Sequence, residues 1–198
     1  MRYDARHKEQ THRQLLDIAG RLLRTGGPEA VSVTQVMGEA GLTNGGFYAH
    51  FRSREDLLAQ AIERAFRDAT AMFERARDGR AAAEALLRYV RSYLSAAHRD
   101  MPELGCPVPA LGADVLRLSN AARVCFTGGV DDLVKRIASL VEALGIEQPQ
   151  AVARSILAEM SGALTLSRIV AEDADASAAI LHDACRSALS RVGLEQRA

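Results

Sequence analysis

Apolar residues recur at helical spacing through almost the whole chain. The first such stretch predicts a helix from about His7 to Arg24, with one apolar face formed by Leu15, Ile18, Ala19, Leu22 and Leu23. Gly26-Gly27 followed by Pro28 predicts its end, because glycine terminates helices and proline cannot continue them. No stretch shows sustained alternation of apolar and polar residues, so the pattern predicts an all-α fold.

Two short helices are predicted next. Ser32 and Gln35 have the spacing of a capping box, which predicts a helix beginning at Val33. Its inner face is formed by Val36, Met37 and Ala40. Gly41 breaks this helix after about two turns, and Thr43 can serve as the N-cap of another short helix that ends near His50.

A longer helix follows the two short ones. Ser53 is its predicted N-cap, with Asp56 at the N3 position. The apolar stripe of this helix contains Leu57, Leu58, Ala61, Ile62, Ala65 and Phe66. Two short helices joined by a glycine-containing turn, and flanked by helices that bury them, form a helix-turn-helix arrangement.

Beyond residue 80 the pattern predicts five further helices, which brings the total to about nine. They cover about 82–98, 108–118, 119–143, 148–171 and 176–193, and Pro, Gly or Asp stands at each break. We therefore expect two parts. Residues 1–54 form an N-terminal helix-turn-helix domain, and residues 55–198 form a larger helical domain.

Charge is distributed unevenly between these two parts. The 198 residues have a formal net charge of zero, yet residues 1–54 hold eight Lys/Arg against five Asp/Glu, and the remainder has the opposite excess. This asymmetry suggests that the N-terminal part meets an anion. The N-terminus lacks the apolar core of a signal peptide, and three widely separated cysteines do not suit a disulfide scaffold, so we expect a cytoplasmic protein.

The stretch GLTNGGFYAHF, residues 41–51, contains two adjacent glycines, which lower the helix propensity of the second short helix. The second helix of a helix-turn-helix enters the major groove of DNA, and glycines would let its backbone approach the bases closely. Asn44 can pair with adenine through both ends of its amide. The predicted DNA-binding residues are Thr34, Thr43, Asn44, Gly45, Gly46, Tyr48, His50 and Arg54, with Phe47 and Phe51 turned inward.

Taken singly, these residues have ordinary alternatives. A glycine pair most often marks a plain turn, and Tyr48 and His50 could be unremarkable surface residues. Their combination, placed directly after a capped helix that ends at Gly41, favours DNA recognition.

Residues 32–58, SVTQVMGEAGLTNGGFYAHFRSREDLL, resemble the DNA-binding segment of the TetR family of bacterial transcriptional regulators. The matching positions are Ala40-Gly41-Leu42-Thr43, Phe47-Tyr48-Ala49-His50-Phe51, Ser53-Arg54-Glu55 and Leu57-Leu58. Three positions depart from the family pattern. Met37 replaces a usually small residue, Gly38 an often charged one, and Arg54 a common lysine.

The resemblance implies a repressor that binds a double-stranded DNA operator as a homodimer and leaves it when a small-molecule effector binds. It places the dimer contact on the last two helices, at Ile156, Met160, Ala163, Leu164, Leu181, Ala184, Cys185, Ala188 and Val192. The alternative is that these stripes pack only within their own subunit.

The effector, by the same resemblance, binds among the middle helices. Candidate lining residues are Leu86, Tyr89, Val90, Tyr93, Met101, Val124 and Phe126, any of which could instead be core. Cys106 lies between Gly105 and Pro107, and some family members carry a Gly-Cys near this position, whose thiol in some of them senses electrophiles or oxidants. A buried, inert cysteine is the alternative for Cys106. Cys125 and Cys185 lie on apolar faces and look like core.

Two other classes of function fit the sequence less well. A helical enzyme or metal protein would need clustered ligands, and the one Glu-x-x-His motif, Glu9 to His12, has no partner. A helical adaptor that binds only protein would leave the residues at 44–50 unexplained. We therefore predict no enzymatic activity, no metal and no cofactor.

Overall fold

The computed structural model describes residues 2–194, and within that range every regular element is helical. The α-helices are α1 (Arg2–Gly26), α2 (Val33–Glu39), α3 (Arg54–Arg77), α4 (Ala82–Tyr93), α5 (Ala96–Asp100), α6 (Pro107–Leu111), α7 (Asn120–Ala143), α8 (Pro149–Ile169) and α9 (Ala174–Ser190). Four 3-10 helices join them: η1 (Pro28–Ala30), η2 (Asn44–Ala49), η3 (Pro102–Leu104) and η4 (Val115–Arg117). The all-α prediction is confirmed.

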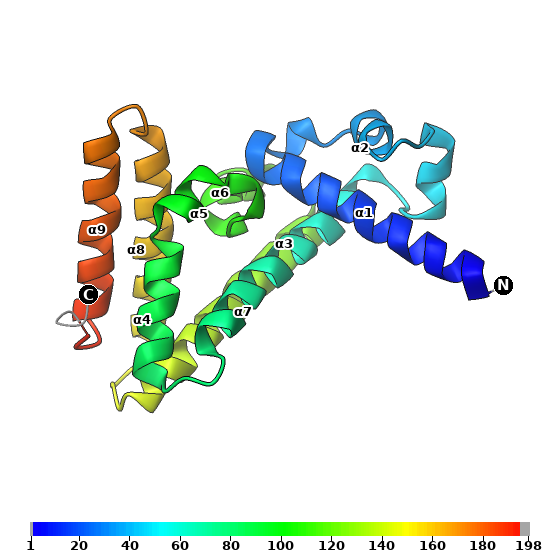
Figure 1. The fold of residues 1–198 in the computed structure, drawn as a ribbon. Coiled ribbons are helices and arrows are strands. Elements are labelled where there is room, and N and C mark those ends of the chain that lie inside the picture. The colour runs from blue at the N-terminus through cyan, green and yellow to red at the C-terminus, as the bar shows by residue number, and fades with distance from the viewer. Residues whose placement is uncertain (1, 195–198) are drawn as a thin grey trace.

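The helices form an elongated arrangement with the N-terminal elements at one end (Figure 1). α3 packs along α7 through the middle of the molecule, and α1 crosses the beginning of α3. α8 and α9 lie side by side at the opposite end, where α8 also packs on α7. No helix within residues 2–194 is both long and apolar enough to cross a bilayer.

Two of the predicted helices are each divided in the structure. The stretch expected as one helix over 82–98 breaks after Tyr93, because the hydroxyl of Ser95 accepts from the backbone N–H of His98 and so caps a new helix, α5. The stretch expected over 108–118 consists of α6, which ends at Leu111, and the separate turn η4. Both breaks lie in the connection that leads from α4 to α7.

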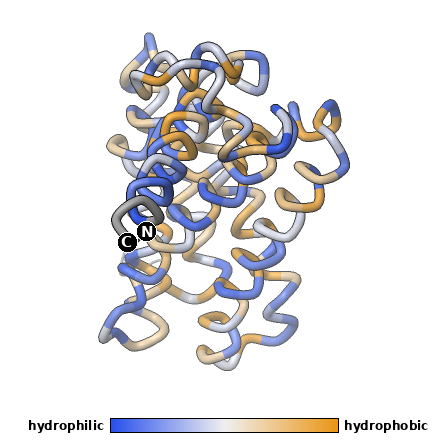
Figure 2. The backbone as a smooth tube through the Cα atoms, turned by 90° about the vertical axis from the view of Figure 1, so that its right-hand side faces the viewer, coloured by the Kyte–Doolittle hydropathy of each residue, from blue (hydrophilic) through white to orange (hydrophobic). Residues whose placement is uncertain are grey.

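Buried apolar and aromatic side chains join α3 to both ends of the molecule. In the larger part, Phe73 of α3 meets Tyr89 of α4 edge-to-face, with ring centroids 5.0 Å apart. Near the start of α3, Leu57 and Ile62 are fully buried in the region where α1 packs. Hydrophobic and hydrophilic residues both occur along the helices (Figure 2), as expected of helices with one face toward the core and one toward solvent. α3 therefore belongs to the core of both parts.

The crossing of α3 and α7 depends on one glycine. A Cβ atom added to Gly129 would lie 2.3–2.5 Å from ring carbons of Phe66, closer than any real contact. The adjacent Gly128 has open space at the same position. Phe66 also packs edge-to-face on Phe126 of α7, at 5.2 Å between ring centroids. Gly129 thus lets the aromatic ring of α3 rest directly on the backbone of α7.

This difference predicts opposite effects of the same substitution at two neighbouring positions. Gly129→Ala should lower the free energy of unfolding by about 1–3 kcal/mol, because the Phe66 ring would have to shift. Gly128→Ala is the matched control and should raise the stability by about 0.5–1 kcal/mol, since alanine is the better helix former. Urea unfolding of both variants measures the effect, and equal stabilisation by the two substitutions would contradict the packing at Gly129.

Candidate DNA-binding surface

The cap at the start of α2 and the turn after its end set the position of η2 against α2. The hydroxyl of Ser32 accepts from the N–H of Gln35 at 3.1 Å, which confirms the predicted cap of α2. Gly41 has a φ of 71°, a conformation that glycine adopts without strain, and the chain reverses there. Thr43 occupies the N-cap position of η2, but its side chain makes no capping hydrogen bond. The capping role predicted for the Thr43 hydroxyl is therefore wrong.

Buried aromatic rings hold η2 from beneath. Phe47 and Phe51 are 1% and 2% exposed, with ring centroids 5.4 Å apart, so the prediction that both face inward is confirmed. A Cβ atom on Gly46 would lie 3.4 Å from the terminal methyl group of the fully buried Met37. Gly46 therefore lies directly over Met37, the large residue at a position where a small one was expected. Gly46 itself is exposed, so its predicted role in letting the backbone approach the bases stays a prediction.

Most of the predicted DNA-binding residues lie on the outer side of this unit. Tyr48 is 77% exposed, and its ring meets the edge of Phe47 at 5.4 Å between centroids. Asn44 donates through Nδ2 to the hydroxyl of Thr34 at 3.1 Å, which ties the start of η2 to the start of α2. The exposed members of the set are Thr34, Thr43, Asn44, Gly45, Gly46 and Tyr48. The structure thus brings these polar groups and the open backbone at Gly45 onto one exposed unit.

His50 lies at the inner edge of this surface and contacts α1. Its ring stacks on that of His12 with centroids 5.9 Å apart, and Nδ1 is buried without a hydrogen-bond partner among the described residues. Burial lowers the pKa of His50 below its ordinary value, and the proximity of His12 and Lys8 lowers it further. His50 is therefore neutral at pH 7 in the free protein.

A chain of side-chain hydrogen bonds fixes the loop that follows η2. The ring Nε2 of His12 is 3.1 Å from Oε1 of Gln60, whose Nε2 donates to Asp56 at 2.9 Å. The other carboxylate oxygen of Asp56 accepts from the backbone N–H of Arg52 at 2.8 Å, and the hydroxyl of Ser53 accepts from the N–H of Asp56 at 3.2 Å. This chain confirms Ser53 as the cap of α3. It also couples the loop to α1, a long-range contact that no local pattern could reveal.

Arg54 has a structural contact in place of the one that we predicted. Its Nε donates to the backbone oxygen of Val31 at 2.7 Å, and Nη2 donates to that of Pro28. The guanidinium group therefore fastens α3 to the connection between α1 and α2. Because two of its N–H groups bond within the protein, Arg54 is not among the DNA contacts proposed below.

The beginning of α1 extends the candidate surface. A shallow cleft of about 290 Å³ has walls from α1 and from the α2–η2 unit. Its lining residues are His7, Lys8, Thr11, Met37, Leu42, Thr43, Gly46, Ala49 and His50. The contribution of His7, Lys8 and Thr11 was not predicted residue by residue, although the basic excess of residues 1–54 indicated it.

The residues predicted to bind an effector are not all in one place. Leu86, Tyr89, Val90 and Tyr93 are fully buried, and Phe126 is nearly so. Met101 and Val124, in contrast, are 43% and 61% exposed, so they do not share the buried core of the other five, and their role in binding an effector stays a prediction. The hydroxyl of Tyr89 is buried and has no hydrogen-bond partner within the described chain. That hydroxyl is therefore an unsatisfied polar group inside the core.

Cys106 lies in the same buried region. Its backbone N–H donates to Nε2 of His98 at 3.0 Å, so that nitrogen carries no proton, and Nδ1 of His98 donates to the backbone oxygen of Tyr93 at 2.7 Å. The side chain of Cys106 is 1% exposed, and burial raises the pKa of its thiol. In this conformation Cys106 is a protonated thiol, shielded from solvent.

The residues predicted to form a dimer contact face their own subunit. Ile156, Met160, Leu164 and Ala188 are fully buried, and Ala163, Leu181 and Val192 are at most 7% exposed. Only Ala184 and Cys185 are half-buried. The buried seven have almost no surface left to offer a second chain, so the assignment is wrong for them and the alternative of packing within the subunit holds. The face of α8 that stays open instead carries Ser155, Ala158, Gly162, Leu166 and Ile169.

Among the described residues, no group of three or more His, Cys, Asp or Glu side chains could hold a metal ion. Glu9 and His12 therefore belong to no such group of possible metal ligands.

Comparison with known proteins agrees with this arrangement. Residues 15–61 match the family model described as "Bacterial regulatory proteins, tetR family". A TetR transcriptional regulator from Chloroflexus aurantiacus superposes with a TM-score of 0.81 at 21% identity, covering 94% of this chain and 96% of the other. The reduced form of Escherichia coli NemR gives 0.79 at 20% identity, covering 90% and 95%. No curated protein sequence matches the chain. At these identities the structural likeness shows the fold.

The lowered pKa of the half-buried His50, whose Nδ1 atom is buried, predicts a pH dependence of stability. Its pKa in the folded protein lies below the value of about 6.5 expected for the unfolded chain. Its contribution to stability is therefore fully present above pH 6.5 and is lost as the pH falls through the folded pKa. Urea unfolding between pH 7.5 and 5 should show a smaller loss of stability for His50→Gln than for the wild type. The exposed control His182→Gln should keep the wild-type slope, and an unchanged slope in His50→Gln would contradict the assignment.

Proposed function

Because this chain belongs, by the match over residues 15–61, to the TetR family of transcriptional regulators, we propose that it is a homodimeric repressor controlled by a small-molecule effector. In this proposal residues 1–54 bind the operator, and residues 55–198 dimerise and bind the effector. The observation that supports it most is the exposed polar unit of Asn44, Gly45 and Tyr48, which is held on the buried rings of Phe47 and Phe51.

The chemistry of this unit suits the major groove of DNA. The Oδ1 atom and one amide hydrogen of Asn44 remain available after its bond to Thr34, so a base edge can pair with them. The exposed hydroxyl of Tyr48 and that of Thr43 can donate to phosphate oxygens. Lys8 of α1, exposed beside the same unit, adds a positive charge. Base contacts would thus come from the start of η2 and backbone contacts from its surroundings.

One such unit reads only a few base pairs, so two copies are needed for a specific operator. Helix-turn-helix dimers bind half-sites about 34 Å apart, one turn of the double helix. The exposed stripe on α8 suits the dimer contact, since Ala158 and Gly162 are small and Leu166 and Ile169 are 54% and 72% exposed. Open space around Gly162 lets a second helix approach closely. We propose this face of α8 as the centre of the dimer interface.

The effector site is proposed in the core around Tyr89. A buried hydroxyl without a partner costs about 1–3 kcal/mol, and a ligand that hydrogen-bonds to it would recover that energy. Tyr89 packs on Phe73 of α3, the helix whose first turn fixes the loop after η2. A ligand that displaces Phe73 would therefore move the DNA-binding unit through α3.

Of the two signals expected from the sequence, this geometry favours a small molecule over an oxidant. The thiol of Cys106 is shielded and its pKa is raised, whereas an oxidant-sensing thiol needs thiolate character and access to solvent. Cys106 is then a wall of the effector site, next to Tyr93.

Binding to an operator selected from randomised duplexes tests the proposed function. Tyr48→Phe removes one phosphate contact and should weaken binding to every sequence by a similar factor, roughly two- to tenfold. Asn44→Ala should cost about 1–3 kcal/mol on the selected operator and little on other sequences, because it removes a base contact. Fluorescence anisotropy at one fixed salt concentration measures both, with His182→Gln on α9 as control. Wild-type affinity in both variants would contradict the proposed surface.

The dimer face makes a separate prediction. Ala158→Glu places a charge in the centre of the open stripe of α8 and should convert the dimer to a monomer that stays folded. Ala97→Glu makes the same change on the exposed side of α5 and should leave the dimer intact. Sedimentation equilibrium distinguishes the two outcomes. A dimer that withstands Ala158→Glu would place the interface elsewhere.

A further inference from the structure

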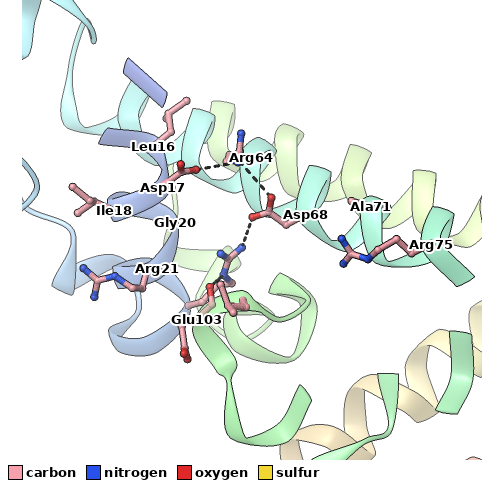
Figure 3. A pocket seen from close by; sticks show the side chains of 12 residues that line it. Leu16, Asp17, Ile18, Gly20, Arg21, Arg64, Asp68, Ala71, Arg75 and Glu103 are labelled. Carbon is pink, nitrogen blue, oxygen red and sulfur yellow. Dashed lines mark hydrogen bonds and ion pairs between the residues drawn. The ribbon is translucent and has the colours of Figure 1, made fainter. Parts of the chain in front are cut away.

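A cleft of about 600 Å³ lies at the joint between the two parts of the molecule (Figure 3). Its walls are α1 and α3, and η3 closes one end. The volume is within the range of about 300–1,000 Å³ typical of small-molecule sites. Four arginines line it: Arg21, Arg24, Arg64 and Arg75. This cleft is separate from the core around Tyr89.

Arg24 is the most buried of these arginines. Its side chain is 4% exposed, its Nε donates to the backbone oxygen of Glu103 at 2.7 Å, and its Nη1 is 3.5 Å from Asp68. That last distance exceeds the usual range of about 2.7–3.2 Å. Burial lowers the pKa of Arg24 below its ordinary value, an effect that Asp68 only opposes in part. The guanidinium group of Arg24 is thus almost fully buried, and its contact with the carboxylate of Asp68 is long.

The neighbouring Arg64 shares the same carboxylate. Its Nε is 3.4 Å from Asp68 and is buried without a properly directed hydrogen bond, while Nη2 is 3.2 Å from Asp17 (Figure 3). One carboxylate, Asp68, therefore serves two guanidinium groups at long range. The planar guanidinium group of arginine can donate two parallel N–H bonds to a carboxylate. The cleft therefore has the space and the donors to bind one more carboxylate.

The remaining lining indicates the rest of the ligand. Of the apolar lining residues, Leu16 is almost fully buried, whereas Leu104 of η3 is 68% exposed. Leu104 therefore offers apolar surface to a group attached to the carboxylate. Asp17 and Asp68 would repel a dianion such as phosphate more strongly than a singly charged acid.

We propose that this cleft binds a small organic acid, whose carboxylate lies between Arg24 and Arg64 and whose apolar part rests against Leu104. Binding replaces the long contacts of Asp68 with a closer partner and loosens the link from Arg24 to Glu103. Because Arg24 joins α1 to η3 and α3, the occupied cleft changes how the DNA-binding unit is held. This second effect rests on the proposed function, whereas binding of the acid does not.

Isothermal titration of the full-length protein without DNA tests the site, with benzoate as the probe and neutral benzamide as its control. We expect saturable binding of one benzoate per subunit and no binding of benzamide. Arg64→Gln should weaken benzoate binding by roughly tenfold or more, because it removes a charged donor. Arg64 is 35% exposed, so this variant should fold even if Arg24→Gln does not.

The matched control is Arg67→Gln, which removes the same charge from the solvent-exposed side of α3 and should keep wild-type affinity for benzoate. The proposal is overturned if benzoate shows no saturation at about 10 mM. It is equally overturned if Arg64→Gln has no effect, if Arg67→Gln weakens binding as much, or if benzamide or inorganic phosphate binds in place of benzoate.

The coupling is measured separately, as operator affinity with and without saturating benzoate. We expect benzoate to change the affinity of the wild type and not that of Arg64→Gln. An unchanged wild-type affinity would overturn the coupling. A protein that binds benzoate in this cleft but binds no DNA would contradict the proposed function while supporting the site.

Discussion

The presentation of η2 to solvent depends on the packing of its inner side. Phe47 and Phe51 fill the small core beneath it, together with the fully buried Met37, whose terminal methyl group lies under Gly46. With its inner side fixed in this way, the six-residue turn can only present Asn44 and Tyr48 outward. A turn this short has little stability of its own, so the buried rings and the chain of bonds from His12 to Asp56 supply it.

α3 connects this unit to everything else. Arg54 in its first turn donates to the backbone oxygen of Pro28, and Ser53 caps its N-terminus. In its middle, the ring of Phe66 packs against the backbone of α7 at Gly129. Further along, Phe73 meets Tyr89 in the core of the larger part. Close-packed interiors transmit strain, so a ligand near Tyr89 and a ligand in the arginine-lined cleft would both act on the DNA-binding unit through this helix. Ligands at the two proposed sites would thus both act on the position of α3.

Local signals in the sequence predicted the fold well and the site in part. Caps such as Ser32 and Ser53, and the glycine at Gly41, act within a few residues, so pattern alone located them. Contacts between distant segments were beyond such reasoning. The sequence predicted Arg54 as a phosphate contact, because its bond to the backbone of Val31 is not visible in any local pattern. The apolar stripe of α8 likewise does not indicate which neighbouring helix covers it. Periodicity marks a buried face, but it does not say whether the same chain or a second copy buries it.

We propose that the outer side of η2 lies in the major groove at two places on one operator. Dimethyl sulfate footprinting tests this placement directly, because the reagent methylates guanine N7 in the major groove and adenine N3 in the minor groove. We expect two protected stretches of guanine N7, about 34 Å apart on one face of the duplex. A stable complex that protects only adenine N3, or that leaves guanine N7 reactive throughout, would contradict it.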